Sequence, residues 1–266
     1  MNPTLQGRTA VVTGGATLVG QGVVEALHEA GATVVIADID QAGATECAER
    51  LGERVHAVQL DITNDDQVAA FATDVVAQHG GIDILVNLAC SYLDNGSQTS
   101  RADWLTALDV NLVSAVRMAA ACREHLAASG HGAIINFTSI SSKVAQTERW
   151  VYPATKAAMV QVTRSMAMDY ADDKIRVNSV SPGWTWSKIM DQLSGGNRTH
   201  TDQVAGDFHF TKRVGDPIEV GRVVAFLASD AASVVTGADW AADGGYSAMG
   251  PEQAVPAIPR LEQAGE

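Results

Sequence analysis

Short apolar runs rich in β-branched residues alternate with stretches of helical periodicity along most of the chain. Most of these runs are nearly continuous in apolar residues, which is typical of strands that are covered on both faces. They occupy residues 10–13, 33–38, 55–61, 83–89, 133–139 and 175–181. Between them, apolar side chains recur three and four residues apart, as in Val23, Leu27 and Ala30. The pattern therefore predicts repeated strand–helix units.

Repeated strand–helix units predict a doubly wound (Rossmann) α/β fold, with a parallel sheet, right-handed crossovers and helices on both faces. No Pro/Ser-rich linker divides the chain, so we expect a single domain over residues 1–247. Within it, the polar, Gly-containing segment of about 187–215 is long for a connection and predicts a substrate loop. The Pro-containing residues 248–266 predict an extended C-terminal tail.

Net charge, cysteines and histidines exclude several classes of protein. The 266 residues include 18 Lys and Arg against 31 Asp and Glu, a formal net charge of -13, which argues against nucleic acid or an anionic membrane as the main partner. The three cysteines lie far apart, and neither they nor the seven histidines have the spacing of a disulfide framework or a metal site. The first residues lack the regions of a signal peptide, so we expect a cytoplasmic protein.

A glycine-containing turn joins the first predicted strand to the first helix. It includes Gly14, Thr17, Leu18, Val19 and Gly20. Glycines in such a turn let backbone N–H groups approach a pyrophosphate at the helix N-terminus. Similar turns also simply connect a strand to a helix, so the turn alone leaves both interpretations open.

An acidic residue at the end of the next strand favours dinucleotide binding. Asp38 lies about 20 residues after the turn, where a carboxylate can accept hydrogen bonds from a ribose diol. No Lys or Arg stands in the turn or beside Asp38 to receive a 2′-phosphate. The sequence therefore predicts NAD as the cofactor, with a solvated turn carboxylate as the alternative interpretation of Asp38.

Tyr152 and Lys156 lie four residues apart in a segment of helical periodicity and so share one face. A nearby ammonium favours the phenolate and lowers the pKa of a tyrosine from its usual value of about 10, which makes it a usable acid or base. Ser139 ends a strand upstream, at the sheet edge where ligands bind, and its hydroxyl can donate to a substrate oxygen. Tyr170 and Lys174 repeat the spacing without an upstream hydroxyl, and we interpret them as a surface pair.

Together these motifs resemble the short, single-domain, NAD-dependent branch of the short-chain dehydrogenase/reductase family over roughly residues 5–247. The resemblance extends to the strand that runs from Asn87 through Cys90 and to the Asp-Val-Asn that ends at Asn111. Leu18 and Cys90 depart from it, because the family usually has glycine at both positions.

The resemblance implies a seven-stranded sheet of order 3-2-1-4-5-6-7, a homotetramer, and the interconversion of a secondary alcohol and a ketone with NAD. It implies that Tyr152 is the general acid and base and that Lys156 holds the cofactor ribose. It implies that Ser139 orients the substrate oxygen and that Asn111 holds a water for proton relay. The implied cofactor-binding residues are Gly14, Thr17, Leu18, Val19, Gly20, Asp38, Ile39, Asp61, Ile62, Asn87, Ala89, Tyr152, Lys156, Pro182, Gly183, Thr185 and Ser187.

Aromatic residues gather around the expected site, although they make up only 5% of the chain. Flat aromatic walls favour a ring-bearing, largely uncharged substrate, although some of these rings can equally pack the substrate loop onto the sheet. A sugar or polyol dehydrogenase, a non-catalytic NAD-binding regulatory protein, and a sugar epimerase or dehydratase stay open as alternatives. The expected substrate-binding residues are Ser139, Tyr92, Trp150, Tyr152 and Trp184.

Overall fold

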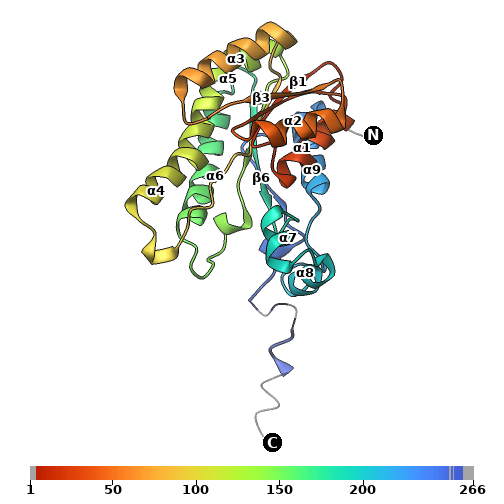
Figure 1. Ribbon diagram of the computed structural model, residues 1–266. Helices are drawn as coiled ribbons and strands as arrows, with labels where there is room; N and C mark the ends of the chain where they lie inside the picture. The colour runs from red at the N-terminus through yellow and green to blue at the C-terminus, as the bar shows by residue number, and fades with distance from the viewer. Residues whose placement is uncertain (1–3, 252, 254, 260–266) are drawn as a thin grey trace, which may run out of the picture.

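Seven parallel strands form one sheet with helices on both faces (Figure 1). The computed structural model describes residues 4–251, 253 and 255–259. The strand order is β3-β2-β1-β4-β5-β6-β7, which confirms the predicted fold class and sheet order. The strands are β1 (Thr9–Thr13), β2 (Thr33–Asp38), β3 (Val55–Gln59), β4 (Ile84–Asn87), β5 (Ala133–Phe137), β6 (Arg176–Pro182) and β7 (Asp239–Ala242).

The sheet separates two apolar cores, because successive side chains of a strand point to opposite faces. Val12 of β1 packs in one core, and its neighbour Val11 packs in the other. The first core is covered by α1 (Leu18–Glu29), α2 (Gln41–Leu51) and α9 (Pro217–Ala228). The second is covered by α3 (Asp65–His79), α5 (Ser114–Ser129) and α6 (Val151–Asp169). Coverage on both faces explains why the strands are nearly continuous in apolar residues.

Helices α1 and α9 cross at unusually close range, although they lie near opposite ends of the chain. A Cβ atom on Gly22 would lie 2.4 Å from the carbonyl carbon of Pro217, and one on Gly221 would lie 2.3 Å from the carbonyl oxygen of Gly22. Side chains at either position would push the helices apart. The crossing therefore fixes the N-terminus of α1, which follows the glycine turn.

A continuous helical stretch, Arg101–Ser129, is long and apolar enough to cross a membrane by length and composition. It consists of α4 (Arg101–Leu108), a π-helical turn (Asp109–Val113) and α5. Met118, Cys122 and Leu126 of this stretch are completely buried in the second core, so packing against the sheet accounts for its apolar character.

The segment expected as a substrate loop is partly helical, and its role towards a substrate stays a prediction. Between β6 and α9 it contains α7 (Lys188–Ser194) and α8 (Arg198–Ala205). The side chains of Ser187 and Asn197 cap these helices, and Gly195 and Gly196 link them with φ angles of 59° and 79°. Helices of seven and eight residues are too short to show a clear apolar periodicity, so the polar composition of the segment concealed them.

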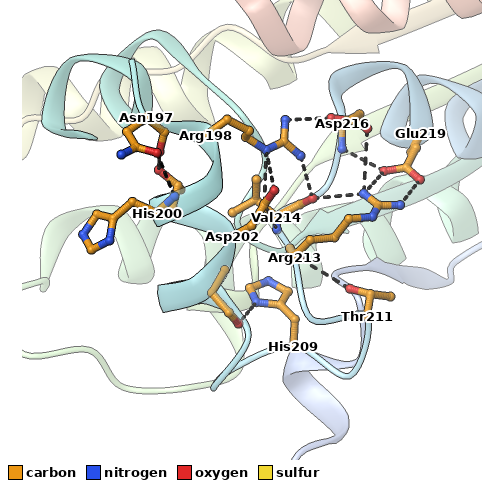
Figure 2. A network of polar contacts seen from close by, with 12 residues as sticks. Asn197, Arg198, His200, Asp202, His209, Thr211, Arg213, Val214, Asp216 and Glu219 are labelled. Atoms are coloured by element: carbon orange, nitrogen blue, oxygen red, sulfur yellow. Dashed lines mark hydrogen bonds and ion pairs between the residues drawn. The ribbon is translucent and has the colours of Figure 1, made fainter. Parts of the chain in front are cut away.

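Figure 2 shows how α8 is fastened to the start of α9. Arg198 donates to Asp202 within α8 at 3.1 Å and to Asp216, which precedes α9, at 2.9 Å. Arg213 donates two hydrogen bonds, of 2.8 and 2.6 Å, to the carboxylate of Glu219. The ion pairs of Arg198 hold α8 against the start of α9. Helix α7 is connected to α8 through Gly195 and Gly196.

The Arg213–Glu219 pair gives a pH-dependent prediction. The hydrogen bonds from Arg213 lower the pKa of Glu219 from 4.5 to about 2. Since the folded pKa lies below the unfolded value, the pair stabilises the protein fully above about pH 4.5, and this stabilisation is lost as the pH falls towards 2. Both side chains are about 40% exposed, so we expect Arg213→Gln to lower the free energy of unfolding at pH 6 by about 1 kcal/mol or less.

Denaturant unfolding of the two proteins between pH 6 and pH 3 checks this expectation. The difference between wild type and variant should shrink as the solution becomes more acidic. A difference that stays constant over this range would contradict the assigned role of the pair.

The division into a domain of residues 1–247 and a tail of residues 248–266 stays a prediction. Residues 252, 254 and 260–266 of that tail lie outside the described residues.

Candidate active site

The carboxyl ends of the parallel strands meet at one edge of the sheet, and the predicted site residues lie along it. The strands predicted over 55–61, 83–89 and 133–139 each end two residues earlier, since β3, β4 and β5 end at Gln59, Asn87 and Phe137. The chain leaves the ladder at these points and is free to turn towards a ligand. The segments released in this way carry Asp61, Ala89 and Ser139.

Tyr152 and Lys156 lie one turn apart at the start of α6, as their spacing predicts. The Nζ atom of Lys156 lies 5.5 Å from the centre of the Tyr152 ring and donates a hydrogen bond of 2.9 Å to the carbonyl of Phe137. Ser139 follows the same strand and is buried, with its hydroxyl paired to that of Ser141 at 3.2 Å. The structure thus brings the three predicted catalytic side chains together.

The environment of the Tyr152 phenol differs from the sequence-based expectation. Burial, followed by the neighbouring Cys90 thiol, raises the pKa of Tyr152. The Ser139 hydroxyl and the charge of Arg149 act in the opposite direction but do not offset the burial. A lysine one helical turn away was expected to lower this pKa, but its ammonium is directed at the Phe137 carbonyl.

Tyr92 covers the ring of Tyr152. The two rings are stacked with centres 5.1 Å apart and an angle of 22° between their planes. Tyr92 itself is 56% exposed, so one side of its ring meets Tyr152 while much of the residue is open to solvent. The guanidinium carbon of Arg149 lies 5.2 Å from the centre of the Tyr152 ring.

Asn111 occupies the π-helical turn between α4 and α5 and is buried. Its Oδ1 accepts a hydrogen bond of 2.6 Å from the backbone N–H of Ser91, and its Nδ2 donates to the Ser91 carbonyl at 2.9 Å. Nδ2 also lies 3.2 Å from the Thr155 hydroxyl on α6. Asn111 therefore joins the loop after β4 to α6.

The glycine turn presents free donors at the start of α1. A Cβ atom on Gly20 would lie 2.2 Å from the carbonyl oxygen of Gly14, so only glycine permits a turn this tight. The Thr17 hydroxyl caps the N–H of Gly20. In the described part of the chain, the N–H groups of Leu18 and Val19 have no hydrogen-bond partner. These donors at a helix N-terminus suit a pyrophosphate.

Asp38 ends β2 beside this turn. Its Oδ2 accepts from the N–H of Ala16 at 2.9 Å, and its Oδ1 accepts from the N–H of Asp40 at 3.0 Å. Each carboxylate oxygen has a further lone pair, so the group can also receive the hydroxyls of a ribose. Ile39, the next residue, is exposed.

The remaining predicted cofactor residues lie along the same edge. Asp61 accepts from the hydroxyl and the N–H of Thr63, which lowers the pKa of its carboxyl. Asn87 ends β4 with its Oδ1 buried and without a partner among the described residues. The others are Ile62 beyond β3, Ala89 beyond β4, and Pro182, Gly183, Thr185 and Ser187 at the end of β6 and start of α7.

The two tryptophans of the predicted substrate wall are placed differently from Tyr92. Trp184 packs against Phe208, with ring centres 5.7 Å apart, and against His209 at 6.2 Å. Trp150 immediately precedes α6 and is 55% exposed. Trp184 therefore packs the segment after β6 against the residues beyond α8. This agrees with the alternative interpretation, in which some of these rings pack the loop rather than contact a substrate.

Asp94 lies at the site without any sequence pattern that predicts it there. This buried carboxylate accepts hydrogen bonds from the backbone N–H groups of Trp150 and Tyr152. It lies in a loop with no recognisable motif, and more than fifty residues separate it from the groups it binds. The one sequence feature that indicates a role for Asp94 is its place in the loop after β4, at the sheet edge where ligands bind.

A family model described as enoyl-(acyl carrier protein) reductase matches residues 14–247, which span the sheet edge from Gly14 to Ser187. The chain belongs to the short-chain dehydrogenase/reductase family. It is 37% identical to cis-4-hydroxycyclohexanecarboxylate dehydrogenase of Sinomonas cyclohexanicum, over 91% of this chain and 97% of that protein. It is 33% identical to 3beta-hydroxysteroid dehydrogenase 2 of Eggerthella lenta, over 93% and 97%.

The fold comparison agrees with this membership. The crystal structure of gox2181 superposes with a TM-score of 0.84 at 35% identity, covering 92% of this chain and 98% of that one. The short-chain dehydrogenase/reductase described here is therefore an oxidoreductase of a family that binds a nicotinamide dinucleotide. The unpaired N–H groups of Leu18 and Val19 and the Asp38 carboxylate fit such a group. Leu18 is compatible with this role because it is the first residue of α1 and its side chain is partly exposed.

Proposed function

We propose that this short-chain dehydrogenase/reductase interconverts a ring-bearing, largely uncharged secondary alcohol and its ketone with NAD. The observation that supports this most is the placement of Tyr152. Its phenol is held beside Ser139 and Lys156, and its ring is covered by the exposed ring of Tyr92.

The side chains divide the proton chemistry between them. In oxidation, Tyr152 first loses its own proton, and the resulting phenolate oxygen takes the hydroxyl proton of the alcohol; in reduction, the protonated phenol donates its proton to the ketone oxygen. The Ser139 hydroxyl donates to the same substrate oxygen and supports the charge that develops there. When bound, the nicotinamide accepts or supplies the hydride. Lys156, one helical turn from Tyr152, would hold the ribose, and Asn111 fixes the adjoining loop through Ser91.

NAD is favoured over NADP by the groups around Asp38. If the carboxylate receives the ribose diol, a 2′-phosphate would meet it directly, and two like charges at one site repel. Neighbouring Ile39 and Asp40 supply no cation to offset that repulsion.

A ring-bearing substrate is supported by the exposed aromatic ring of Tyr92 beside Tyr152. Tyr92 stacks on Tyr152 and is more than half exposed, so part of its ring is available to contact a substrate. Two relatives of this chain are named for ring-bearing alcohols, a hydroxycyclohexanecarboxylate and a hydroxysteroid. Burying about 100 Å² of ring surface at about 25 cal/mol per Å² gives about 2.5 kcal/mol, or about 60-fold in kcat/KM.

A kinetic panel tests the proposal. It compares cyclohexanol, 4-hydroxycyclohexanecarboxylate, small 2-hydroxy and 3-hydroxy acids, and polyols, each with NAD. We expect cyclohexanol to exceed the acyclic compounds by about 60-fold in kcat/KM. Highest rates with the small acids or the polyols would contradict the ring-bearing class. A clear preference for the ring acid over cyclohexanol would instead replace the uncharged class and assign Arg149 to the carboxylate.

The same panel separates the enzyme from a non-catalytic NAD-binding protein. NADH fluorescence measures binding independently of turnover. Tight NADH binding with no reduction of any ketone of the panel would favour the regulatory alternative and overturn the proposed reaction.

A further inference from the structure

The loop after β4 reaches across the site to the first turn of the catalytic helix. Asp94 in this loop has only 1% of its side chain exposed. Its Oδ1 accepts from the N–H of Trp150 at 3.0 Å, and its Oδ2 accepts from the N–H of Tyr152 at 2.9 Å. Helix α6 receives no hydrogen bond from the side chain of its own N-cap residue and has no acidic residue in its first turn. A carboxylate from a distant loop therefore serves as the cap.

The turn before α6 is held in an uncommon backbone conformation. Glu148 has a φ angle of 61°, in the left-handed region that residues other than glycine rarely adopt. Gly96, two residues after Asp94, lies against it, and a Cβ atom on Gly96 would be 3.3 Å from the Cα of Glu148. The N–H of Gly96 also donates to Asp94 at 3.2 Å. Such a conformation persists where its surroundings fix it, and this loop supplies those surroundings.

The same loop is fixed at its beginning by Asn111, through both backbone groups of Ser91. Tyr92 lies between these two attachments and stacks on Tyr152. The loop, the stacking ring and the first turn of α6 therefore form one supported unit around the phenol.

We propose that Asp94 is a positioning residue for the reaction: its carboxylate ties the backbone N–H groups of Trp150 and Tyr152 to the β4 loop and thereby fixes the phenol against the substrate oxygen. The inference rests on the proposed function, because that reaction defines where the phenol must stand. The carboxylate charge also lies at the positive end of the helix macrodipole, where it stabilises the first turn.

Two variants of Asp94 remove its hydrogen bonds to α6 to different extents. Asp94→Ala removes both acceptors, and Asp94→Asn keeps one amide oxygen while removing the charge. With the best ring alcohol of the panel and saturating NAD, we expect Asp94→Ala to lower kcat about tenfold or more, because small displacements of a reacting group reduce rates steeply. The Asn variant should fall between the alanine variant and wild type. The NADH dissociation constant, measured by fluorescence, should change less than about twofold in both, because binding and positioning are separate contributions.

Asn64→Ala is the matched control. Asn64 caps α3 by accepting from the N–H groups of Asp66 and Gln67, both at 3.1 Å, as Asp94 accepts from two N–H groups of α6. Its loss should lower the melting temperature as a lost cap does, without changing kcat.

Hydrogen exchange provides a measurement that does not depend on the substrate. In Asp94→Ala, amides of the first turn of α6 should exchange at least about tenfold faster, while those of α9 stay as in wild type. The kcat values are calculated per NADH-binding site, so that unfolded protein in a sample does not lower them. An alanine variant with normalised kcat within twofold of wild type, or with unchanged exchange in α6, would overturn the proposal. If the wild-type protein oxidises none of the ring alcohols, the proposed reaction is refuted. The hydrogen-exchange rates of α6 in Asp94→Ala would still decide whether Asp94 fixes the first turn of the helix.

Discussion

Replacing Tyr152 by phenylalanine should abolish turnover while NADH binding survives. The phenol is the group proposed to exchange the reacting proton, and general acid–base catalysis is worth about 10²–10⁴-fold. Phenylalanine keeps the ring that stacks on Tyr92, so the packing around Lys156 and Ser139 should persist. We therefore expect kcat to fall by at least about 10²-fold, measured by the change in NADH absorbance, with an NADH dissociation constant near that of wild type.

Tyr170→Phe is the control for this variant. Tyr170 follows the last residue of α6, and Lys174 has a φ angle of 59° beyond the helix, so the second pair does not share a helical face. The Tyr170 ring instead lies under the guanidinium of Arg123, 4.4 Å away. The control should retain wild-type kcat. Comparable rates in Tyr152→Phe and Tyr170→Phe would overturn the assignment of the catalytic tyrosine.

Cofactor preference should be the second large effect. We expect wild-type kcat/KM with NAD to exceed that with NADP by at least about 100-fold, because a 2′-phosphate against the Asp38 carboxylate costs several kcal/mol. Asp38→Ala should narrow this ratio, mainly by weakening the use of NAD. The variant also leaves the N–H groups of Ala16 and Asp40 without their acceptor, which adds to the loss.

Asp40→Asn distinguishes a specific contact from the general negative charge of the region. Its amide oxygen can still cap α2 through the N–H of Gly43, so local structure should be preserved. The preference for NAD should be almost unchanged in this control. Equal kcat/KM for the two cofactors in wild type would refute the role of Asp38.

The strand–helix architecture and the shared helical face of Tyr152 and Lys156 were predictable from the sequence because their signals are local. Strands covered on both faces are continuous in apolar residues, and a four-residue spacing places two side chains on one face of a helix. Tyr152 and Lys156 therefore lie as expected, and so does the strand order that the family resemblance implied.

What the sequence did not predict depends on contacts between distant segments. The cap that Asp94 supplies to α6 joins residues more than fifty positions apart, and nothing in either segment indicates the other. The raised pKa of Tyr152 follows from how deeply the phenol is buried, which no spacing encodes. Helices α7 and α8 were missed because each is short and polar, and capping by Ser187 and Asn197 defines them rather than apolar periodicity.

The close crossing of α1 and α9 has a consequence for biosynthesis. The glycines Gly22 and Gly221 bring the first helix against one that is translated nearly last. A nascent chain that has emerged only through β5 therefore exposes the apolar side of α1 and lacks the surface that holds its N-terminus. We therefore expect α1 to gain its full packing, and a bound cofactor to add to the stability of the fold, only after α9 has left the ribosome.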